Sequence, residues 1–478
     1  MISGVRVFEA AGGVLVVGGG PAGMAAAAAA LRHGARVTLL EAGYDLGGQY
    51  WRHLADERRG AHEHRLHHGW STFQRLHEEI TGHPRCDVVL GGSVWAIDRH
   101  DDAPPVVHVM VGAPDGTDRE PRSYTPDRLI LATGGQERTL PFPGWDLPGV
   151  FTAGAAQALA KGERVAVGQR VLVAGAGPFL LPVVSSLIRT GATVVGVAEA
   201  SGRRRLARGW LTRPWELAST SSKAGELGGY LKDLVRHRVP YWTGRTVVAA
   251  HGTDRVHSVT LADLHPDWTR VEGSERVVEV DAVCVSHGFV PRTELAVAAG
   301  CQLDEQGFVI TAAGQQTSVP NVYSAGELTG IGGADLALAE GEVAGTTAAG
   351  GVPRPSLIGQ RKNLQNFAIR LESAHGIRPG WQTWPDPQTM LCRCEDVTVG
   401  ELRDIAAKTQ SRGLRSLKLT TRAGLGVCQG RTCGRNVEDL LSESLLPAGR
   451  TSYRPIATPV RLGELAATIT PEREDPLP

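Results

Sequence analysis

A glycine-rich turn near the N-terminus constrains the fold of this chain more than any other feature. Residues 18–23 read Gly-Gly-Gly-Pro-Ala-Gly and stand between the apolar run 14–17 and the alanine-rich run 24–33. At such a strand-turn-helix junction the glycines let the backbone approach a pyrophosphate closely, and the N-terminus of the helix attracts its negative charge. Glu41 closes the next strand-like run, where a carboxylate accepts hydrogen bonds from a ribose. The pattern predicts a dinucleotide site, rather than a plain connecting turn, at Gly18, Gly20, Gly23 and Glu41.

The same order of strand, glycine turn and alanine-rich helix begins three times, near Val14, Val171 and Val322. The first two copies open β-α-β units, because the runs 36–41 and 192–199 each supply a second parallel strand. A chain of 478 residues is also too long for one ordinary hydrophobic core. The predicted fold is α/β, with two Rossmann-like dinucleotide-binding domains and a small C-terminal four-cysteine domain.

Bulk charge and cysteine content exclude several classes. Fifty basic residues balance fifty acidic ones, so no overall field would attract nucleic acid. The apolar run 14–31 is interrupted by the glycine turn, which favours strand, turn and buried helix over a membrane span. Four of the seven cysteines crowd into the last fifth of the chain, which indicates a metal site in a reducing compartment. Residues 1–20 also show no export leader, so we expect a cytoplasmic location, with peripheral attachment to the inner face of the membrane as an alternative.

Three further segments resemble the pyridine-nucleotide-disulphide-reductase superfamily of FAD proteins. Residues 41–49 resemble its E-x-x-x-x-x-G-G loop beside the flavin, and residues 129–134 resemble its strand-to-ATG segment, where the chain crosses between domains. Residues 317–327 resemble its second FAD motif, whose final Asp holds the ribityl chain and is replaced here by Glu. The resemblance implies FAD as the resident cofactor, held also by Gly48, Gln49, Thr133, Gly134, Gly326 and Glu327.

The second glycine turn, 175–177, departs from the dinucleotide pattern at its third position. Leu180 stands where glycine or alanine normally lets the helix pack closely, and Pro182 removes a backbone donor early in that helix. A bulky residue there is expected to push the helix outward or to fill the groove, and either effect weakens dinucleotide binding. Glu199 and the basic run 203–205 still offer a grip for an adenosine or a phosphate. NAD(P) or another adenine nucleotide is therefore an alternative to an empty structural domain.

Electrons need an outlet other than a disulfide, because no cysteine pair follows the 47–48 turn. The C-terminal region instead offers C-x-C and C-x4-C pairs, whose thiolates suit a [2Fe-2S] cluster, with zinc as the alternative. The region resembles the bacterioferritin-associated ferredoxin type of domain, although that type has C-x-x-C at its second pair. We expect a helix over 399–409, a strand over 416–421 and a helix after the last cysteine. The predicted metal ligands are Cys392, Cys394, Cys428 and Cys433.

No residue pattern identifies a catalytic base. A histidine-rich stretch offers a metal or proton-relay site, but its members share no obvious helical face. A solvated loop or helix is the expectation for His53, His62, His64, His67 and His68.

Over its whole length the chain resembles one subunit of the heteromeric flavin dehydrogenases, a group with opine, D-hydroxyproline and proline dehydrogenases and hydrogen cyanide synthase. The FAD motifs, the four cysteines and the closing segment 453–463 carry this resemblance. It implies a hetero-oligomer in which a D-amino-acid-oxidase-like flavoprotein subunit oxidises a C–N bond and this chain receives the electrons. An FMN at a partner interface and a small ferredoxin-like subunit are open additions.

Two other functions stay open. A stand-alone NAD(P)H-dependent FAD/[2Fe-2S] oxidoreductase would reduce its own cluster, and an iron-sulfur delivery protein would use only the C-terminal unit. We expect the FAD-binding domain in two parts, 1–165 and 291–350, with the inner NAD(P)-like domain, 166–290, between them. A proline-rich connector, 351–388, and the [2Fe-2S] domain with its tail, 389–478, follow.

Overall fold

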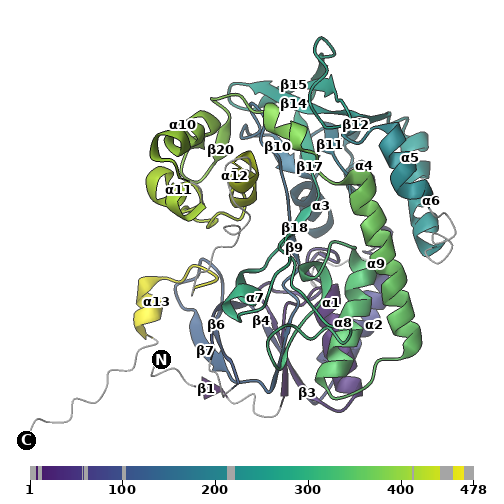
Figure 1. Cartoon of the computed structure of the whole chain (residues 1–478). Helices are drawn as coiled ribbons and strands as arrows, with labels where there is room; N and C mark the ends of the chain where they lie inside the picture. Colours follow the sequence, from purple (N-terminus) through teal and green to yellow (C-terminus); the bar gives the residue numbers. More distant parts are fainter. Residues whose placement is uncertain are drawn as a thin grey trace, which may run out of the picture.

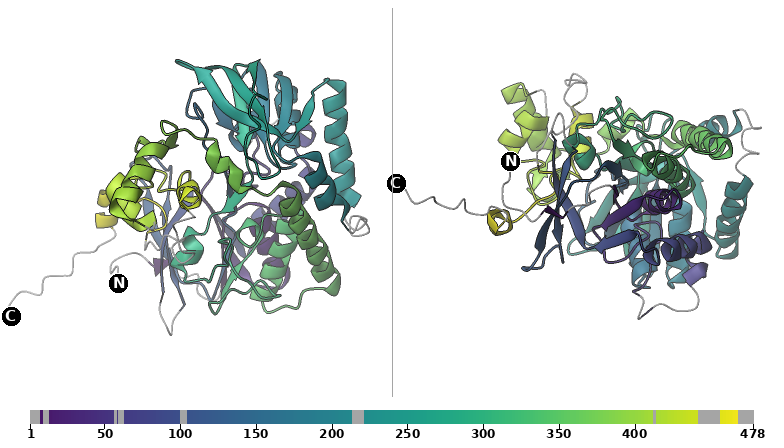
Figure 2. Two further views of the ribbon diagram at one scale, coloured as in Figure 1. Left: turned by 45° about the horizontal axis from the view of Figure 1, so that its top comes forward. Right: turned by 90° about the horizontal axis from the view of Figure 1, so that it is seen from below.

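The computed structural model describes residues 7–8, 13–55, 58, 63–99, 104–212, 221–411, 414–441 and 456–467. Two parallel sheets lie one above the other in Figure 1, and a small helical unit packs to their side. Figure 2 shows the same helical unit, in yellow-green, beside both domains from two other directions. The predicted α/β class, with two dinucleotide-type folds and a small C-terminal unit, is confirmed.

The lower parallel sheet has the strand order β19-β8-β2-β3-β4. Its central strand, β2 (Gly13–Val17), is buried along its whole length, as expected of a parallel strand with helices on one face and a second sheet on the other. Strand β19 joins the sheet from far along the chain, so this domain is discontinuous. The other strands are β3 (Arg36–Glu41), β4 (Cys86–Leu90), β8 (Arg128–Leu131) and β19 (Val322–Ser324). The helices on one face are α1 (Pro21–Arg32), α2 (Trp70–Thr81) and α8 (Ala334–Ala348).

A second sheet of order β1-β7-β6-β5 covers the other face. Val107 and Val109 of this sheet are fully buried against Leu15 and Val17 of β2. Its strands are β1 (Val7–Phe8), β5 (Gly92–Asp98), β6 (Val106–Val111) and β7 (Glu120–Tyr124), and the short helix α7 (Glu294–Ala298) packs with them.

The upper parallel sheet has the order β10-β17-β11-β12-β13. One of its faces packs on helices and the other on an antiparallel sheet of three strands. The parallel strands are β10 (Val150–Thr152), β11 (Arg170–Gly175), β12 (Thr193–Glu199), β13 (Tyr241–Thr243) and β17 (Ala282–Ser286). The helices are α3 (Ala153–Gly162), α4 (Leu180–Arg189), α5 (Arg203–Leu211) and α6 (Ser221–Arg236), and the antiparallel strands are β14 (Arg245–Gly252), β15 (Val256–Asp263) and β16 (Arg276–Glu279).

A two-stranded ribbon and a long helix connect the two domains. Strands β9 (Gly135–Glu137) and β18 (Phe289–Pro291) pair antiparallel where the chain crosses between the sheets. Helix α9 (Pro355–His375) packs on α8 of the lower domain and on α5 of the upper one. The connector between α9 and the C-terminal unit is the 3-10 turn η5 (Pro379–Thr383).

The C-terminal unit is a small bundle around its own apolar core. It comprises β20 (Met390–Cys392), β21 (Val397–Thr398), α10 (Val399–Thr409), α11 (Leu414–Thr421) and α12 (Gly434–Leu440). Thr398 and Glu401 form a reciprocal capping box at the start of α10, which begins and ends where the sequence predicts.

The strand expected over 416–421 is wrong, because these residues belong to helix α11. Leu414, Leu417 and Thr421 are buried at helical spacing, whereas Leu419 is 77% exposed. The alternation of Leu417 and Leu419 imitates a strand, but only one of them reaches the core. Packing of one helical face therefore overrides the β-branched threonines. No helix within the described residues has the length and apolar character needed to cross a bilayer.

Two glycines let α8 lie at backbone contact distance from α1. A Cβ added at Gly345 would lie 2.0 Å from the carbonyl oxygen of Ala26, and one added at Gly341 would lie 2.1 Å from that of Ala22. Because α1 starts directly at the first glycine turn, this packing also fixes the position of that turn.

We expect Gly345→Ala to lower the free energy of unfolding by about 1–3 kcal/mol, because the backbone of α1 must move to make room. Thermal and denaturant unfolding measure this loss. The matched control is Gly359→Ala on α9, where an added Cβ meets nothing within 4 Å and alanine favours the helix. Equal unfolding temperatures for Gly345→Ala and the wild-type chain would contradict the packing argument.

Candidate functional site

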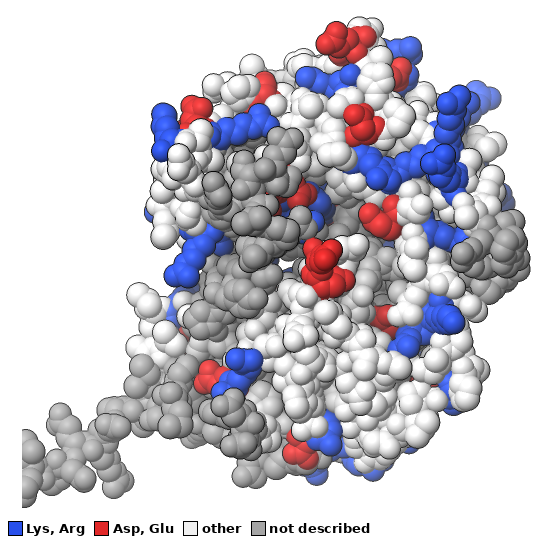
Figure 3. Space-filling model, viewed as in Figure 1, with Lys and Arg blue, Asp and Glu red and all other residues white. Residues whose placement is uncertain are grey.

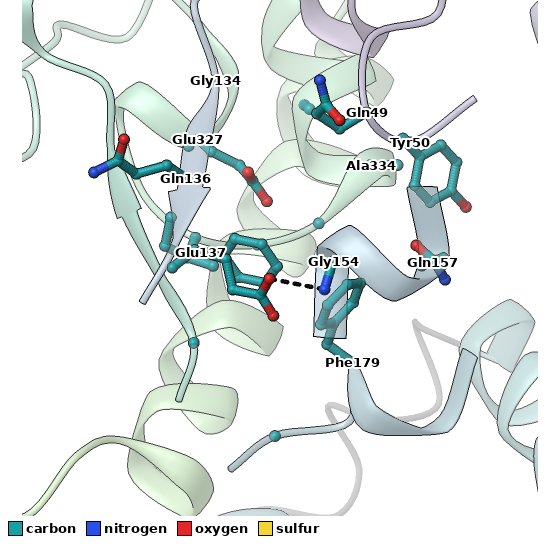
Figure 4. Close-up of a pocket in the computed structure, with 18 of the residues that line it drawn as sticks. Gln49, Tyr50, Gly134, Gln136, Glu137, Gly154, Gln157, Phe179, Glu327 and Ala334 are labelled. Atoms are coloured by element: carbon teal, nitrogen blue, oxygen red, sulfur yellow. Dashed lines mark hydrogen bonds between the residues drawn. The ribbon is translucent and has the colours of Figure 1, made fainter. Parts of the chain in front are cut away.

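A cavity of about 2320 Å³ opens where the carboxyl ends of β2, β3 and β8 meet. It runs from the first glycine turn past the β9–β18 ribbon into the upper domain, and Figure 4 shows its central part. Pockets for one drug-sized ligand measure about 300–1,000 Å³, so this cavity has room for an extended dinucleotide. The predicted cofactor residues that line it are Gly18, Gly20, Glu41, Gly48, Gln49, Thr133, Gly134, Gly326 and Glu327.

The first glycine turn forms a cradle that side chains would fill. Gly18 has φ +109°, and a Cβ there would lie 2.3 Å from the carbonyl oxygen of Ala132. A Cβ at Gly23 would lie 1.7 Å from the carbonyl oxygen of Gly18, and one at Gly48 would lie 2.8 Å from the Cα of Gly20. The turn, the start of α1 and the 47–48 loop thus meet backbone to backbone, as close approach to a pyrophosphate requires.

Glu41 closes this cradle at the end of β3. Its Oε2 accepts from the backbone N–H of Gly19 at 2.6 Å, and its Oε1 accepts from that of Gly43 at 2.7 Å. The carboxylate is only partly buried and lines the cavity. It therefore has lone pairs left for the hydroxyls of a ribose.

The second predicted FAD segment forms a turn beside the start of α1, where a Cβ added at Gly326 would lie 2.8 Å from the Cβ of Ala22. Gly326 has φ +79°, and its N–H donates to Glu340 at 3.0 Å. Thr329 donates to the same carboxylate oxygen at 2.7 Å. Glu340 was not predicted from the sequence, although a single buried acid among the alanines of α8 is a signal for such a role.

Glu327 points into the cavity in Figure 4 and is partly buried. Burial raises the pKa of this carboxyl to about 7, and only the N–H of Gly135 opposes that rise. A partly buried, desolvated carboxylate with one backbone donor has room for further donors, which the hydroxyls of a ribityl chain supply. The replacement of the usual Asp by Glu therefore still fits FAD, and the glycine cradle fits its pyrophosphate.

The β9–β18 ribbon separates the lower and upper parts of the cavity. Glu137 accepts from the N–H of Gly154 at 2.7 Å and ties β9 to the start of α3. Burial raises the pKa of this carboxyl, and one of its oxygens has no hydrogen-bond partner. Phe179 and Phe289 meet edge to face at 5.0 Å between ring centroids.

Of the two effects predicted for Leu180, the filling of the groove is wrong. Its side chain is fully buried in the core of the upper domain, so it does not fill the groove. The wall of the cavity at this turn consists of Gly177, Pro178 and Phe179.

Glu199 is instead the residue that closes the second nucleotide site. It is fully buried and accepts from the backbone N–H groups of Gly177 at 3.0 Å and Ser201 at 2.9 Å. The Tyr241 hydroxyl, at 3.4 Å, and His375 Nδ1, at 3.2 Å, occupy its remaining side. Because His375 ends α9, the connector helix covers the carboxylate that a ribose would need.

The basic run after Glu199 also contacts the C-terminal end of α9. Arg205 donates to the carbonyl oxygens of Ser373 at 3.0 Å and Gly376 at 2.8 Å. Desolvation lowers the pKa of its guanidinium to about 10. In this arrangement Arg205 holds α9 in place rather than a phosphate.

The four predicted metal ligands meet as two pairs. Cys433 donates a hydrogen bond to Cys392, which lowers the pKa of Cys392 to about 5, and both side chains are buried. Cys394 and Cys428 contact each other at the more exposed edge. No three described His, Cys, Asp or Glu side chains gather around one point in the manner of a single-metal site. Two thiol pairs fit a two-iron cluster, in which each iron takes two thiolates.

Glycines keep the ligand loop tight. A Cβ added at Gly426 would lie 2.3 Å from the Cβ of Cys394, and Gly424 and Gly430 approach each other with φ of +84° and +79°. Backbone N–H groups of Gly424 and Glu395 point at the sulfur of Cys392. Such donors tune a cluster's potential.

The C-terminal unit docks directly beside the cavity. The side chain of Gln136 on β9 donates to the carbonyl oxygen of Arg431 at 2.5 Å, within the loop that carries Cys428 and Cys433. Asn436 donates to the carbonyl oxygen of Thr139 at 2.7 Å. A buried ion pair joins Arg138 to Asp439, and Arg431 and Asp439 line the cavity itself. These contacts could not be predicted from the sequence, because they join segments far apart in the chain.

The histidine prediction is partly wrong. His53 and His67 are buried, and His67 Nε2 lies 3.3 Å from Glu63. Burial lowers the pKa of His67 to about 3, so it is neutral at physiological pH. His64 and His68 are exposed as expected, and His62 lies outside the described residues.

Two family models match most of the chain. The model described as pyridine nucleotide-disulphide oxidoreductase matches residues 12–341, and that of the BFD-like [2Fe-2S] binding domain matches residues 390–443. The chain is 31% identical to the A subunit of opine oxidase from Rhizobium meliloti over 479 residues, which cover 95% of this chain and 87% of the relative. It is 31% identical to the HcnB subunit of hydrogen cyanide synthase from Pseudomonas protegens over 450 residues, which cover 90% of this chain and 92% of the relative.

Two more distant proteins are also similar to this chain. The alpha subunit of sarcosine oxidase from Corynebacterium is 28% identical over 489 residues, and the match covers 97% of this chain but 46% of that relative. Among solved structures, L-proline dehydrogenase from P. horikoshii is similar with a TM-score of 0.63 and 20% identity over 96% of this chain and 80% of that one. This last likeness concerns the fold.

The buried Glu327 predicts a pH-dependent stability of the ligand-free protein. Its native pKa of about 7 lies above the ordinary 4.5, so between these values the native state holds a proton that the unfolded state releases. Stability from this group is present below pH 4.5 and is lost as pH rises toward 7, by at most about 3 kcal/mol. Glu327→Gln should remove that loss. The unfolding temperature of the variant should therefore rise relative to that of the wild-type chain as the pH is raised from 4 to 8.

The control is Glu272→Gln, which changes an exposed side chain. It should leave the pH profile unchanged. Parallel profiles for the wild-type chain and Glu327→Gln would contradict a buried, protonated Glu327.

Proposed function

Because this chain belongs to the pyridine nucleotide-disulphide oxidoreductase family, in the group of the opine oxidase A subunits, we propose that it is the electron-transferring subunit of a heteromeric amine or imino-acid dehydrogenase. Its family and its BFD-like domain imply FAD and a [2Fe-2S] cluster in an oxidoreductase. A separate D-amino-acid-oxidase-like flavoprotein subunit oxidises the C–N bond in this proposal, and the present chain takes the electrons onward.

One observation carries the proposal: the strand that lines the flavin cavity also holds the loop that carries two cysteine ligands. Gly135 donates to Glu327, and the next residue, Gln136, donates to the carbonyl oxygen of Arg431. The two redox sites therefore share a wall. A flavin takes up electrons as a pair and a [2Fe-2S] cluster takes them singly, so this chain can split the pair.

The chain's own residues hold and shield the cofactor. The Gly18–Gly23 turn and the start of α1 would hold the pyrophosphate, Glu41 the adenosine ribose and Glu327 the ribityl chain. No cysteine pair lies in this cavity, and the described residues that line it include no thiol. Transfer to a disulfide therefore has no acceptor here.

The sealed Glu199 argues against the stand-alone NAD(P)H oxidoreductase. Glu199 accepts from two backbone donors, as Glu41 does. Its remaining side is covered by His375 and the Tyr241 hydroxyl, so the upper domain lacks a free ribose ligand. Electrons from an outside subunit are the source that fits this geometry better. An adenine nucleotide in the upper domain would have to displace α9.

Partner chemistry follows from the names of the relatives. Opine oxidase and sarcosine oxidase act, by name, on N-substituted amino acids, and the matched chains are individual subunits. We extend to this chain the same dependence on a second, substrate-oxidising subunit, with an interfacial FMN and a small ferredoxin-like subunit as further members. Acidic and basic side chains lie interspersed over the face in Figure 3, which gives no support to nucleic-acid binding. Unpaired thiols that ligate iron fit a cytoplasmic setting, whether free or at the inner face of the membrane.

The first test is an anaerobic spectral titration of the purified chain, after its FAD and iron contents have been measured. We expect neither NADH nor NADPH to bleach the flavin, and we expect reduction only when an amine substrate is added together with the amine-oxidising subunit. Flavin bleaching by NADH or NADPH, followed by reduction of the cluster, would overturn this proposal and establish the stand-alone reductase. His375→Ala should leave the NAD(P)H result negative, because the Tyr241 hydroxyl still covers the side of Glu199 that its backbone donors leave free.

The second test concerns the cluster. Cys394→Ser changes an exposed ligand, so the unit should still fold, but we expect it to lose the iron-sulfur absorbance and most of about two irons per chain while keeping FAD. Cys86→Ser on β4 is the matched control and should keep both cofactors. Stoichiometric zinc without iron in the wild-type chain would contradict the assignment.

A further inference from the structure

Residues near the C-terminus pack on the FAD-binding domain. Residues 456–467, here called the C-terminal strap, end in the short helix α13 (Leu462–Ala467), which lies beside β6 and β7 in Figure 1. Ala457 N–H donates to the carbonyl oxygen of Trp95 at 2.7 Å, and the Thr458 hydroxyl donates to that of Val94 at 3.2 Å. Val460 and Leu465 pack on the same sheet. The strap therefore belongs structurally to the FAD-binding domain.

A buried ion pair fixes the strap. Arg119 Nε lies 2.7 Å from Glu464, and the two side chains are 6% and 10% exposed. Arg461 donates to the carbonyl oxygen of Asp115 at 2.8 Å. The strap is thus anchored independently of the [2Fe-2S] unit.

Arg431 connects the cysteine-ligand loop to helix α7 and to the strap. Its guanidinium lies 2.6 Å from the carboxylate of Glu294 on α7 and donates at 2.8 Å to the carbonyl oxygen of Ala457 in the strap. Its own carbonyl accepts from Gln136 on β9. One residue between two cysteine ligands therefore contacts α7, β9 and the strap, three parts of the domain that holds the flavin cavity.

The contact suits arginine in particular. A planar guanidinium presents several donors in fixed directions, so one nitrogen of Arg431 donates to the Ala457 carbonyl oxygen while its charge lies beside the Glu294 carboxylate as an ion pair. A lysine keeps the positive charge but lacks the fixed direction of the hydrogen bond to the Ala457 carbonyl oxygen. The Arg431 side chain is 19% exposed and that of Glu294 is 26% exposed, so water weakens the pair only in part.

We propose that Arg431 is a positioning residue that sets the distance between the [2Fe-2S] ligand loop and the flavin cavity, with Glu294 and the strap as its fixed points. In the step concerned, one electron leaves the reduced flavin and reduces one ferric iron of the cluster, and no bond to Arg431 forms or breaks. This inference rests on the proposed flavin-to-cluster electron transfer. The rate of that step falls steeply when the two centres separate.

The test compares Arg431→Gln and Arg431→Lys with Arg422→Gln in the full, cofactor-loaded chain. Arg422 is the matched control, because it pairs at 2.6 Å with Glu395 inside the [2Fe-2S] unit and its side chain is 68% exposed. Flash photolysis with a photoexcited deazaflavin as electron donor gives the flavin-to-cluster rate. Iron content and the EPR signal of the reduced cluster report whether the unit is intact, and hydrogen exchange reports docking.

We expect Arg431→Gln to keep its iron and EPR signal but to transfer electrons about tenfold more slowly or worse. Amide exchange should rise in the strap and in β9. The transfer rate and the exchange of Arg431→Lys should lie between those of Arg431→Gln and the wild-type chain, and those of Arg422→Gln should match the wild-type chain. Wild-type rate and exchange in Arg431→Gln would overturn the inference.

Two further outcomes keep the test decisive. Should Arg431→Gln lose its cluster, Glu294→Gln decides, since Glu294 lies outside the unit: a slowed rate with intact iron supports the inference, and an unchanged rate overturns it. Should the wild-type chain itself show no flavin-to-cluster transfer, the proposed function fails. The exchange of the strap and β9 then still reports whether Arg431 docks the unit.

Discussion

Three consecutive residues on strand β9 contact the flavin cavity, the [2Fe-2S] unit and the upper domain. The N–H of Gly135 donates to Glu327 of the flavin cavity, the side chain of Gln136 donates to the cluster loop, and Glu137 accepts from the start of α3 in the upper domain. Pairing with β18 fixes the register of this strand. Because neighbouring residues on a strand point to opposite faces, a slip by one residue would exchange the partners of the cavity and the cluster unit.

Much of this arrangement could be predicted from local sequence. The glycine turn, its flanking strand and helix, and the order of the motifs predicted the two dinucleotide-type folds and the superfamily, which the family match confirms. The strand Arg36–Glu41 and the helix Val399–Thr409 have the predicted bounds. Local patterns misled where packing decides: the segment 416–421 is helical because Leu417 alone reaches the core, and His53 and His67 are buried in a cluster of aromatic rings.

Residues that act across domains could not be predicted in this way. Glu340, Gln136 and Arg431 belong to segments whose neighbours are set only by tertiary packing. The two motif acids show the same limit. Glu41 and Glu199 both accept from their glycine turns at similar distances, yet the first stays open to the cavity and the second is covered by α9. A duplicated motif therefore predicts the local backbone, while the element packed on it decides whether a ligand can enter.

The chemistry of the seam between the [2Fe-2S] unit and the FAD-binding domain indicates what that seam is for. Removing charges from water costs about as much as their pairing returns, so buried pairs such as Arg138 with Asp439 contribute little net stability. Apolar residues of similar size would hold the unit as firmly, but they would allow it to slide or rotate. Directional contacts from arginine, asparagine and glutamine side chains instead permit one orientation. We infer that the seam fixes the geometry between two redox sites. For electron transfer between them, a small displacement lowers the rate more than a small loss of stability does.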